Sequence, residues 1–358
     1  ALGVIFGAFL HMAIQIPSAI ASGFKYAPIF NLRSPELKRV FVLLLPRTLG
    51  AAASQINTVV ITAFASTLIS GSVAIFNFAN NLRGFPIVLI GLSLATATFP
   101  YLSRTWAKGE KKEFLESLFS SFRQTLFLII PTSVFMFFLS TPLVELILGG
   151  GRFGAIDTEL TAAAIRIFSL GVFAFALLPL LNKAFFSFQN TKTPVVIGMV
   201  SVVFNAFFCY FFVWLISISL PFQALMRSLF SLKISPDIRV IGLSLGFLIS
   251  GLFNFFALYI FLNKKLKTSF SSNEDLFFGQ IRKTNAAIRK ILLAAGAMAG
   301  CFYFFLKISA PFIGSGAIRD LLLQLSLAGI LGGSLYLLVS FFLKSEEMKS
   351  IKNSLTNK

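Results

Sequence analysis

The sequence has 358 residues, of which 56% are hydrophobic, 12% are charged and 45 are phenylalanine. A soluble domain of this length does not bury so much apolar surface, so the composition excludes the soluble classes of protein. The formal charge of +18 would indicate nucleic-acid binding in a soluble protein. Here the basic residues fall between hydrophobic segments, where topology and anionic headgroups explain them, and we expect no nucleic-acid partner.

About nine apolar runs are long enough to cross a bilayer as helices. The runs are continuous rather than alternating, which favours helices over a β-barrel. The sequence therefore predicts an all-α, polytopic helical membrane protein that contacts membrane lipids. The predicted spans are 2–22, 40–66, 73–102, 120–148, 162–188, 194–216, 239–262, 288–308 and 319–343.

The connections between the spans predict the topology. The loops after the first, third, fifth, seventh and ninth spans carry most of the basic residues, so these loops and the C-terminus are expected to be cytoplasmic. Residues 25–39 read as a cytoplasmic linker, 265–287 as a flexible cytoplasmic loop and 344–358 as a basic tail. The chain begins inside a hydrophobic run without a methionine, and we expect a fragment that starts part-way through a longer protein.

Arg83 is the strongest candidate site residue. It lies about ten residues, or roughly 15 Å, along its helix from Val73, near the middle of the hydrocarbon core. A charge at that depth costs roughly 2.5–3.5 kcal/mol on insertion scales and persists where it faces protein or water. We expect Arg83 to line a polar cavity for an anionic substrate. The alternative is a structural arginine that caps carbonyls freed by a kink at Gly84 and Pro86.

The second predicted span carries further polar candidates. Arg47 follows Pro46 at a shallow depth, and cavity function and snorkelling to the headgroups both fit it. Gln55 and Asn57 lie deeper and need a polar partner or a cavity. Near the outer end of the fifth span, Arg166 is expected to reach the outer headgroups. Residues 221–233 have the spacing of an amphipathic helix on the outer surface.

Motifs for catalysis and for cofactor binding are missing from the sequence. There is no Walker motif, HExxH, GxSxG or spaced Cys/His set, and Cys209 and Cys301 do not have metal-ligand spacing. We therefore predict no enzyme activity, no catalytic residue, no cofactor and no metal. The chain is expected to move or bind something rather than convert it.

Several segments in this order resemble the MurJ (MviN) family of lipid II flippases, within the MATE-like MOP exporter superfamily. The resemblance extends over most of the chain. The segments are Leu45-Pro46…Leu49-Gly50…Ser54-Gln55-Ile56-Asn57, Leu94-Ala95-Thr96-Ala97…Pro100-Tyr101-Leu102-Ser103, Gly151-Arg152-Phe153…Asp157-Thr158…Leu160-Thr161, Ala164-Ile165-Arg166-Ile167…Leu170-Gly171, and Gln189-Asn190-Thr191-Lys192-Thr193-Pro194 followed by Asn205.

The resemblance implies fourteen helices in two six-helix lobes plus an extra pair, of which this chain holds the later part. On this basis residues 1–24 are the last helix of the first lobe, 40–264 are the second lobe, and 288–343 are the extra pair that forms a groove for the lipid tail. It also implies transport of an undecaprenyl-pyrophosphate-linked muropeptide, lipid II, across the bacterial inner membrane by alternating access. Cell-wall synthesis proteins are a candidate class of partner.

Two departures affect the residues that the resemblance implies. The family's usual Tyr-Ala-Asp-Arg-Leu is Phe78-Ala79-Asn80-Asn81-Leu82 here, so the expected arginine is Asn81 and Arg83 is displaced by two residues. An aspartate often found after Gln-Ile-Asn is Ile61, and Cys209 replaces a polar residue, which argues against sodium coupling at those positions.

The predicted substrate-binding residues are Arg83 and Arg47 for pyrophosphate, and Asn80, Asn81, Gln55 and Asn57 for sugar or peptide. Two alternatives stay open. One is an exporter of another polysaccharide lipid or of a small molecule, and the other is a membrane scaffold that transports nothing.

Overall fold

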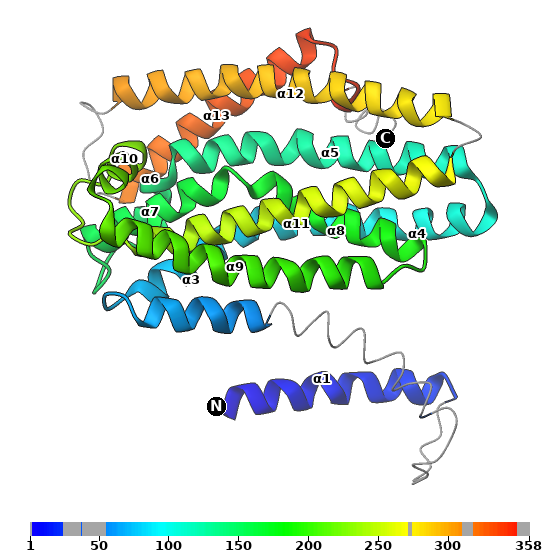
Figure 1. The fold of residues 1–358 in the computed structure, drawn as a ribbon, viewed down its shortest axis with the longest axis horizontal. Helices are drawn as coiled ribbons and strands as arrows, with labels where there is room; N and C mark the ends of the chain where they lie inside the picture. Colours follow the sequence, from blue (N-terminus) through cyan, green and yellow to red (C-terminus); the bar gives the residue numbers. More distant parts are fainter. Residues whose placement is uncertain (1, 24–36, 38–54, 271–273, 310–317, 349–358) are drawn as a thin grey trace. The chain divides into compact units, whose positions relative to one another are not determined.

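The computed structural model describes residues 2–23, 37, 55–270, 274–309 and 318–348 (Figure 1). The chain divides into two compact units, Ala1–Arg47 and Thr48–Lys358. The described part of the first unit is mainly the apolar helix α1 (Leu2–Ala21). Within α1, His11 and Gln15 lie one turn apart, and the Gln15 amide is 3.2 Å from His11 Nδ1.

The second unit is a bundle of long apolar helices. Over the described residues of the whole chain, seven helices can cross a membrane, and α7 with α8 makes an eighth if this bent pair is one span. A shorter apolar helix, Gln55–Ser66, is the described part of the predicted second span. The polytopic helical class is confirmed. The remaining elements are α3 (Ser72–Pro86), the π-helix η1 (Ile87–Leu92), α4 (Ser93–Lys108), α5 (Lys111–Phe138), α6 (Ser140–Leu148), α7 (Ala155–Ser169), α8 (Val172–Ser187), α9 (Lys192–Ile218), α10 (Leu220–Phe230), α11 (Val240–Ser269), α12 (Glu274–Ser309) and α13 (Ile318–Phe342).

Two predicted spans are broken helices in the structure. The span predicted at 120–148 is α5 followed by α6, and the span at 162–188 is α7 and α8, which meet at 51° next to Gly171. A Cβ atom on Gly171 would lie 2.2 Å from Leu248 Cδ1, so a larger residue at the bend would require the Leu248 side chain of α11 to move. Continuous hydrophobicity hides such breaks, because both halves are equally apolar.

The predicted flexible loop at 265–287 is wrong over most of its length. Helix α11 continues to Ser269, and α12 begins at Glu274. Glu274 and Asp275 occupy the first turn of α12, where acidic side chains favour a helix start. The buried positions that follow recur at helical spacing, which marks an amphipathic helix whose polar face resembles a loop in composition. These positions are Phe277, Gln280, Thr284, Ala287 and Ile291.

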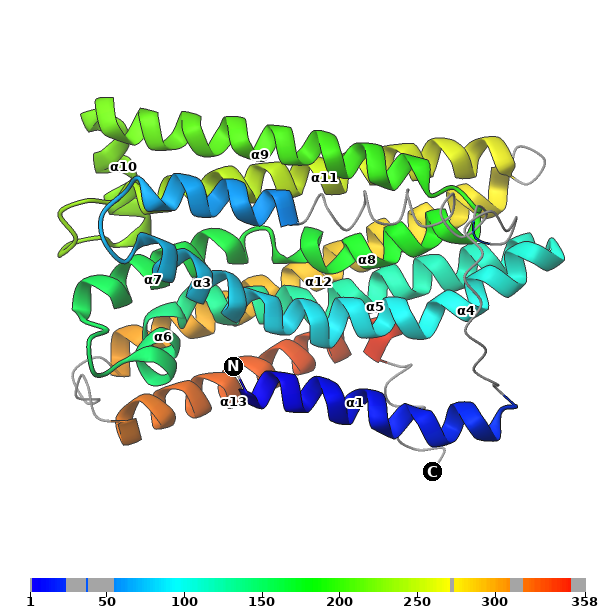
Figure 2. The same cartoon turned by 90° about the horizontal axis from the view of Figure 1, so that it is seen from below.

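Helix α8 lies at the centre of the second unit. It packs against α4, α5, η1 and α11, while α9 covers α11 and α12 packs on α5 and α13 (Figures 1 and 2). The α4–α5 turn, the α8–α9 turn and the end of α11 lie at the same end of the bundle (Figure 1). We name this the basic end, because it carries Lys108, Lys111, Lys192 and Lys265.

The segment after α13 is fixed to α5 by a buried ion cluster. Arg123 Nε lies 3.3 Å from Glu347 Oε1, and Arg123 Nη2 lies 3.9 Å from Glu346. Ser345 Oγ donates to Glu347 Oε2 at 2.7 Å, and the Lys290 ammonium donates to the Lys344 carbonyl. The cluster therefore attaches the α12–α13 pair to the other helices of the second unit.

Glycine allows η1 to touch α8, and this contact gives a test of the packing. A Cβ atom on Gly91 would lie 2.3 Å from the Ala176 carbonyl oxygen, whereas a Cβ atom on Gly84 would meet nothing within 4 Å. We expect Gly91→Ala to destabilise the protein by roughly 1–3 kcal/mol, because backbone atoms must separate. In a chain of this size that lowers the melting temperature in detergent by several degrees.

Gly84→Ala is the matched control on the same continuous helix. It adds a methyl group in open space and improves helix propensity, so its melting temperature should equal or exceed that of the unchanged protein. Equal melting temperatures for the two variants would contradict the packing described for η1 and α8.

Candidate functional site

Arg83 lies on α3, one turn before the π-helix, and only 7% of the residue is exposed. Its Nη2 donates to Asn80 Oδ1 at 2.7 Å, one turn back along the same helix. The Nε and Nη1 groups are buried, and among the described residues they have no hydrogen-bond acceptor. The guanidinium therefore keeps most of its hydrogen-bonding capacity unused.

Three phenylalanine rings surround the guanidinium, and we name them the aromatic box: Phe168 of α7, Phe175 of α8 and Phe247 of α11. Arg83 Cζ lies 4.7, 4.2 and 4.4 Å from the three ring centroids, respectively. Phe175 and Phe247 stack at 5.4 Å. A Cβ atom on Gly251 would lie 2.1 Å from the Phe175 ring, so this glycine on α11 provides the space for Phe175.

The box explains how an arginine is retained at this depth without a carboxylate. Each desolvated cation–π contact contributes about 0.5–2 kcal/mol, and an arginine at the centre of a membrane helix costs roughly 2.5–3.5 kcal/mol on insertion scales. Three contacts are enough to offset that cost. They do not neutralise the charge, so the site remains positive and attractive to an anion.

Arg166, by contrast, has neutral acceptors for its guanidinium. Its Nε donates to Ser140 Oγ at 2.8 Å, its Nη2 to Thr141 Oγ1 at 2.9 Å and its Nη1 to the Phe230 carbonyl at 2.5 Å. The expectation that Arg166 reaches the outer headgroups is wrong, because these acceptors hold it inside the bundle. Arg166 joins α6, α7 and the end of α10, which is a structural role.

Asn57 is held by other residues of the second unit. Asn205 Nδ2 of α9 donates to Asn57 Oδ1 at 2.5 Å, and Asn205 Oδ1 is 3.3 Å from Ser250 Oγ and 3.4 Å from Cys209 Sγ. The polar partner that the sequence requires for Asn57 is therefore Asn205. Among the described residues, no group of three His, Cys, Asp or Glu side chains is arranged to hold a metal ion.

The other predicted site residues are dispersed. Asn80 contacts Arg83, whereas Asn81 and Gln55 are exposed on the surface of the second unit. Asn81 is two residues from Arg83, about 200° around the helix, and so faces away from the box. Arg47 lies outside the described residues. The structure thus brings Arg83 and Asn80 together and separates both from Asn81.

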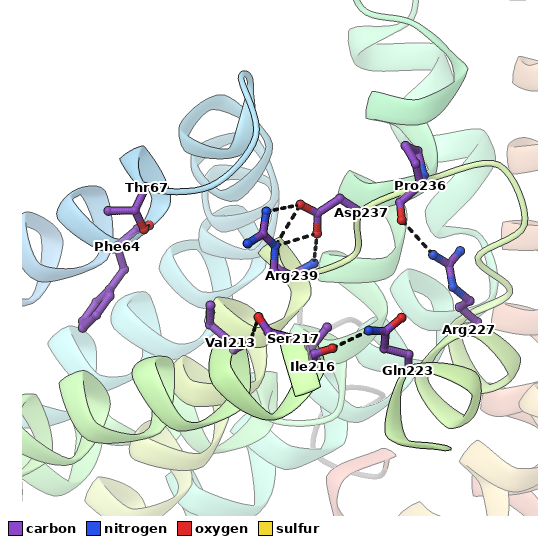
Figure 3. A network of polar contacts seen from close by, with 10 residues as sticks. All are labelled: Phe64, Thr67, Val213, Ile216, Ser217, Gln223, Arg227, Pro236, Asp237 and Arg239. Atoms are coloured by element: carbon purple, nitrogen blue, oxygen red, sulfur yellow. Dashed lines mark hydrogen bonds and ion pairs between the residues drawn. The ribbon is translucent and has the colours of Figure 1, made fainter. Parts of the chain in front are cut away.

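A polar network fixes the loop between α10 and α11 at the end of the bundle opposite the basic end (Figure 3). Arg227 donates to the carbonyls of Ser235 and Pro236 at 2.8 and 3.1 Å. Arg239 pairs with Asp237 at 2.6 Å. Burial raises the pKa of the Asp237 carboxyl, but the hydrogen bonds and charge of Arg239 outweigh burial and hold this pKa below its ordinary value.

Glu159 of α7 binds the same loop through its carboxylate. Its carboxylate accepts hydrogen bonds from the backbone N–H groups of Lys233, Ile234 and Ser235, and from Ser235 Oγ. Successive N–H groups that converge on one oxygen pair form a nest for an anion. Here the anion is a side chain of the protein, so the loop is fixed rather than available to a ligand.

We expect Glu159→Gln to raise the amide hydrogen-exchange rate of residues 233–235 by about tenfold, because charge-assisted hydrogen bonds become neutral ones. The measurement is exchange followed by mass spectrometry. Glu145→Gln on α6 is the control, since the Glu145 side chain has no hydrogen bond or ion pair in the described structure. Unchanged exchange in Glu159→Gln would mean that Arg227 alone fixes the loop.

The aromatic box could not be found from the sequence. Its rings come from three helices and are among 45 phenylalanines, so nothing in the residue types distinguishes them. Asn205 was visible as a polar residue in an apolar run, but its pairing with Asn57, 148 positions away, depends on the fold. Gly251 is one of three glycines inside the apolar helix α11, and glycines in such a helix are a sequence signal of close packing.

The fold and the site define a class: a polytopic helical membrane protein with an unneutralised arginine buried at mid-helix. A family model described as lipid II flippase MurJ matches residues 1–322. The chain therefore belongs to the MurJ family of lipid II flippases.

Individual proteins agree with this assignment. The probable lipid II flippase MurJ of Buchnera aphidicola subsp. Schizaphis graminum is 29% identical over 350 residues, 96% of this chain and 60% of that protein. The lipid II flippase MurJ of Burkholderia cenocepacia is 30% identical over 220 residues, 60% of this chain and 43% of that protein.

A solved structure is also similar, described as lipid II flippase MurJ in an inward closed conformation. It has a TM-score of 0.60 and 23% identity, over 92% of this chain and 59% of that one, which shows a likeness of fold. The chain thus spans about three fifths of the length of the Buchnera relative and of this structure.

Proposed function

We propose that this chain forms the later part of a lipid II flippase, which moves an undecaprenyl-pyrophosphate-linked muropeptide from the inner to the outer leaflet by alternating access. Membership of the family supports the substrate class. In this proposal the protein transports its substrate without chemical conversion and lies in the bacterial inner membrane. The basic end and the C-terminus are cytoplasmic, in agreement with the distribution of lysine and arginine.

The division of the chain follows from the same proposal. Residues 1–24 are the last helix of the first lobe, 25–39 a linker and 40–264 the second lobe. Residues 288–343 are the two extra helices with the groove for the lipid tail, and 344–358 are the basic tail. The attachment of the α12–α13 pair to α5 through Arg123 and Glu347 supports an accessory pair that stays in place.

The single observation that carries the proposal is the set of contacts that the Arg83 guanidinium makes. Among the buried arginines of the described structure, Arg123 has carboxylates, Arg166 has neutral acceptors, and Arg83 has one amide and three rings. A guanidinium with two unused donor groups binds phosphate oxygens through parallel, charge-assisted hydrogen bonds. Arg83 is thus the described arginine best prepared to receive a pyrophosphate.

Contact with the pyrophosphate requires the guanidinium to leave the aromatic box or the rings to separate. Phe175 and Phe247 are only half-buried, so the guanidinium would leave the aromatic box past these two rings. In this proposal, the Arg83 guanidinium lies in the aromatic box when no anion is bound. Arg47 is proposed as a second pyrophosphate contact, and Asn80, Asn81, Gln55 and Asn57 as contacts to sugar or peptide. Asn57 must exchange its bond to Asn205 to take part.

The test is complementation of a bacterium depleted of its own lipid II flippase, with the complete coding sequence and with Arg83 variants. We expect Arg83→Ala to abolish rescue and Arg83→Lys to rescue poorly, because lysine keeps the charge but loses the planar fork. Growth and cell shape at equal membrane abundance are the readouts.

Arg104→Ala is the control, since Arg104 is an exposed arginine of the same continuous helix. It should rescue as well as the unchanged protein. Full rescue by both Arg83 variants would remove Arg83 from the pyrophosphate site. Failure of the unchanged protein, when it is present in the membrane, would favour another polysaccharide lipid as substrate or a scaffold role.

A further inference from the structure

Lys183 lies on a partly exposed face of α8, beside α4, and is a second cation that no carboxylate neutralises. Its ammonium donates to Thr96 Oγ1 of α4 at 2.6 Å and lies 5.8 Å from the centroid of the Phe99 ring. Within the described residues, no carboxylate lies within 4 Å of this ammonium. Two of its three N–H groups are therefore available for an acceptor.

The direction of the side chain argues against snorkelling. Lys183 lies four residues, or about 6 Å, before the end of α8 at Ser187, so its stem is long enough to reach that end. Helical side chains lean toward the N-terminus of their helix, and Lys183 follows this rule. Its partner Thr96 is twelve residues, about 18 Å, inside the end of α4 at Lys108. The ammonium thus points away from the end of α8, along the partly exposed face that α8 shares with α4.

Thr96 holds Lys183 in this direction without competing for the ligand. The Thr96 hydroxyl donates its proton to the Leu92 carbonyl at 2.7 Å, so toward Lys183 its oxygen acts as the acceptor. Leu92 is the last residue of η1, where the helix passes from π to α geometry. Thr96 is therefore a positioning residue, and Lys183 is the residue that would meet an anion.

Lys183 and the aromatic box lie on the same helix. Phe175, which touches Arg83, is eight residues before Lys183, a rise of about 12 Å along α8. Lys183 is closer than Phe175 to the end of α8 at Ser187, and α8 ends toward the basic end (Figure 1). A pyrophosphate group is much shorter than this rise of about 12 Å, so a single ligand would meet Lys183 and Arg83 in succession.

We propose that Lys183, positioned by Thr96, is a binding residue for the phosphoryl group of a lipid-linked pyrophosphate, occupied before Arg83. The inference rests on the proposed function and extends its site toward the basic end. Phosphoryl groups are carried both by a polyprenyl pyrophosphate and by bulk anionic phospholipids. The proposed ligand of Lys183 is the polyprenyl pyrophosphate. Lysine suits a first contact, since it binds phosphate as a point charge without a fixed fork.

The test measures lipid affinity of the protein made from its complete coding sequence, in phosphatidylcholine nanodiscs, by native mass spectrometry. The probes are a polyprenyl pyrophosphate, the matching polyprenyl monophosphate and phosphatidylglycerol. We expect Lys183→Gln to bind the pyrophosphate about tenfold more weakly, the loss of one charge-assisted contact. Lys183→Arg should stay within about threefold of the unchanged protein, and Thr96→Val should lose about threefold.

Lys192→Gln is the control, because it removes a lysine at the α8–α9 turn outside the bundle, and it should bind like the unchanged protein. Equal loss in Lys192→Gln and Lys183→Gln would mean a general effect of charge and would overturn the proposal. Equal loss of phosphatidylglycerol and pyrophosphate affinity in Lys183→Gln would make Lys183 a headgroup anchor and overturn it too.

Arg83→Gln separates this inference from the proposed function. If Arg83→Gln loses pyrophosphate affinity and Lys183→Gln does not, Lys183 is not a binding residue and the proposed function is unaffected. If the unchanged protein does not prefer the pyrophosphate lipid over phosphatidylglycerol, the proposed function fails and the Lys183 site fails with it.

Discussion

A guanidinium held among three phenylalanine rings is the interaction on which the proposed site depends. Cation–π contacts offset the cost of burying Arg83, whereas a carboxylate would also have cancelled its charge. The box needs rings from α7, α8 and α11, so these helices must converge on one point. Gly171 at the α7–α8 bend and Gly251 on α11 allow that convergence, since a Cβ atom at either position would collide with a neighbouring side chain.

The α10–α11 loop and residues 344–347, by contrast, are held by several hydrogen bonds and ion pairs each. Arg166 and Glu159 attach the end of α10 and the loop after it to α6 and α7, and Arg227 attaches that loop to α10. Arg123 attaches the residues after α13 to α5. Such networks leave few donors or acceptors unused and fix their segments. Among the described cations, Arg83 and Lys183 keep donors unused along the membrane-spanning helices: Arg83 is buried, and Lys183 lies on a partly exposed face.

The sequence was sufficient for the class of fold and for singling out Arg83 as a charge within an apolar span. Continuous apolar runs predict helices because the backbone must pair within each segment, and Arg83 was conspicuous because charge is costly at its depth. The breaks at Leu139 and Gly171 and the helical start of α12 were missed, since hydrophobicity alone does not report bends and an amphipathic extension looks polar. The box was not predictable, because its rings are separated by up to 79 positions and meet only when α7, α8 and α11 are packed.

The single helix that runs from Ser72 to Lys108 relates the two cationic positions. It carries Arg83 before the π-helix and Thr96 after it. A π-helix changes the number of residues per turn, and so sets how the faces of the flanking α-helices are rotated relative to each other. In this chain both Arg83 and Thr96 face α8, where they meet Phe175 and Lys183, and Arg83 also reaches α7 and α11. Because Gly91 packs directly on Ala176, the segment that sets the rotation is also the contact with α8, which carries Phe175 and Lys183. A shift of η1 along α8 would therefore change the surroundings of both cations together, which is what a site that passes an anion from one to the other requires.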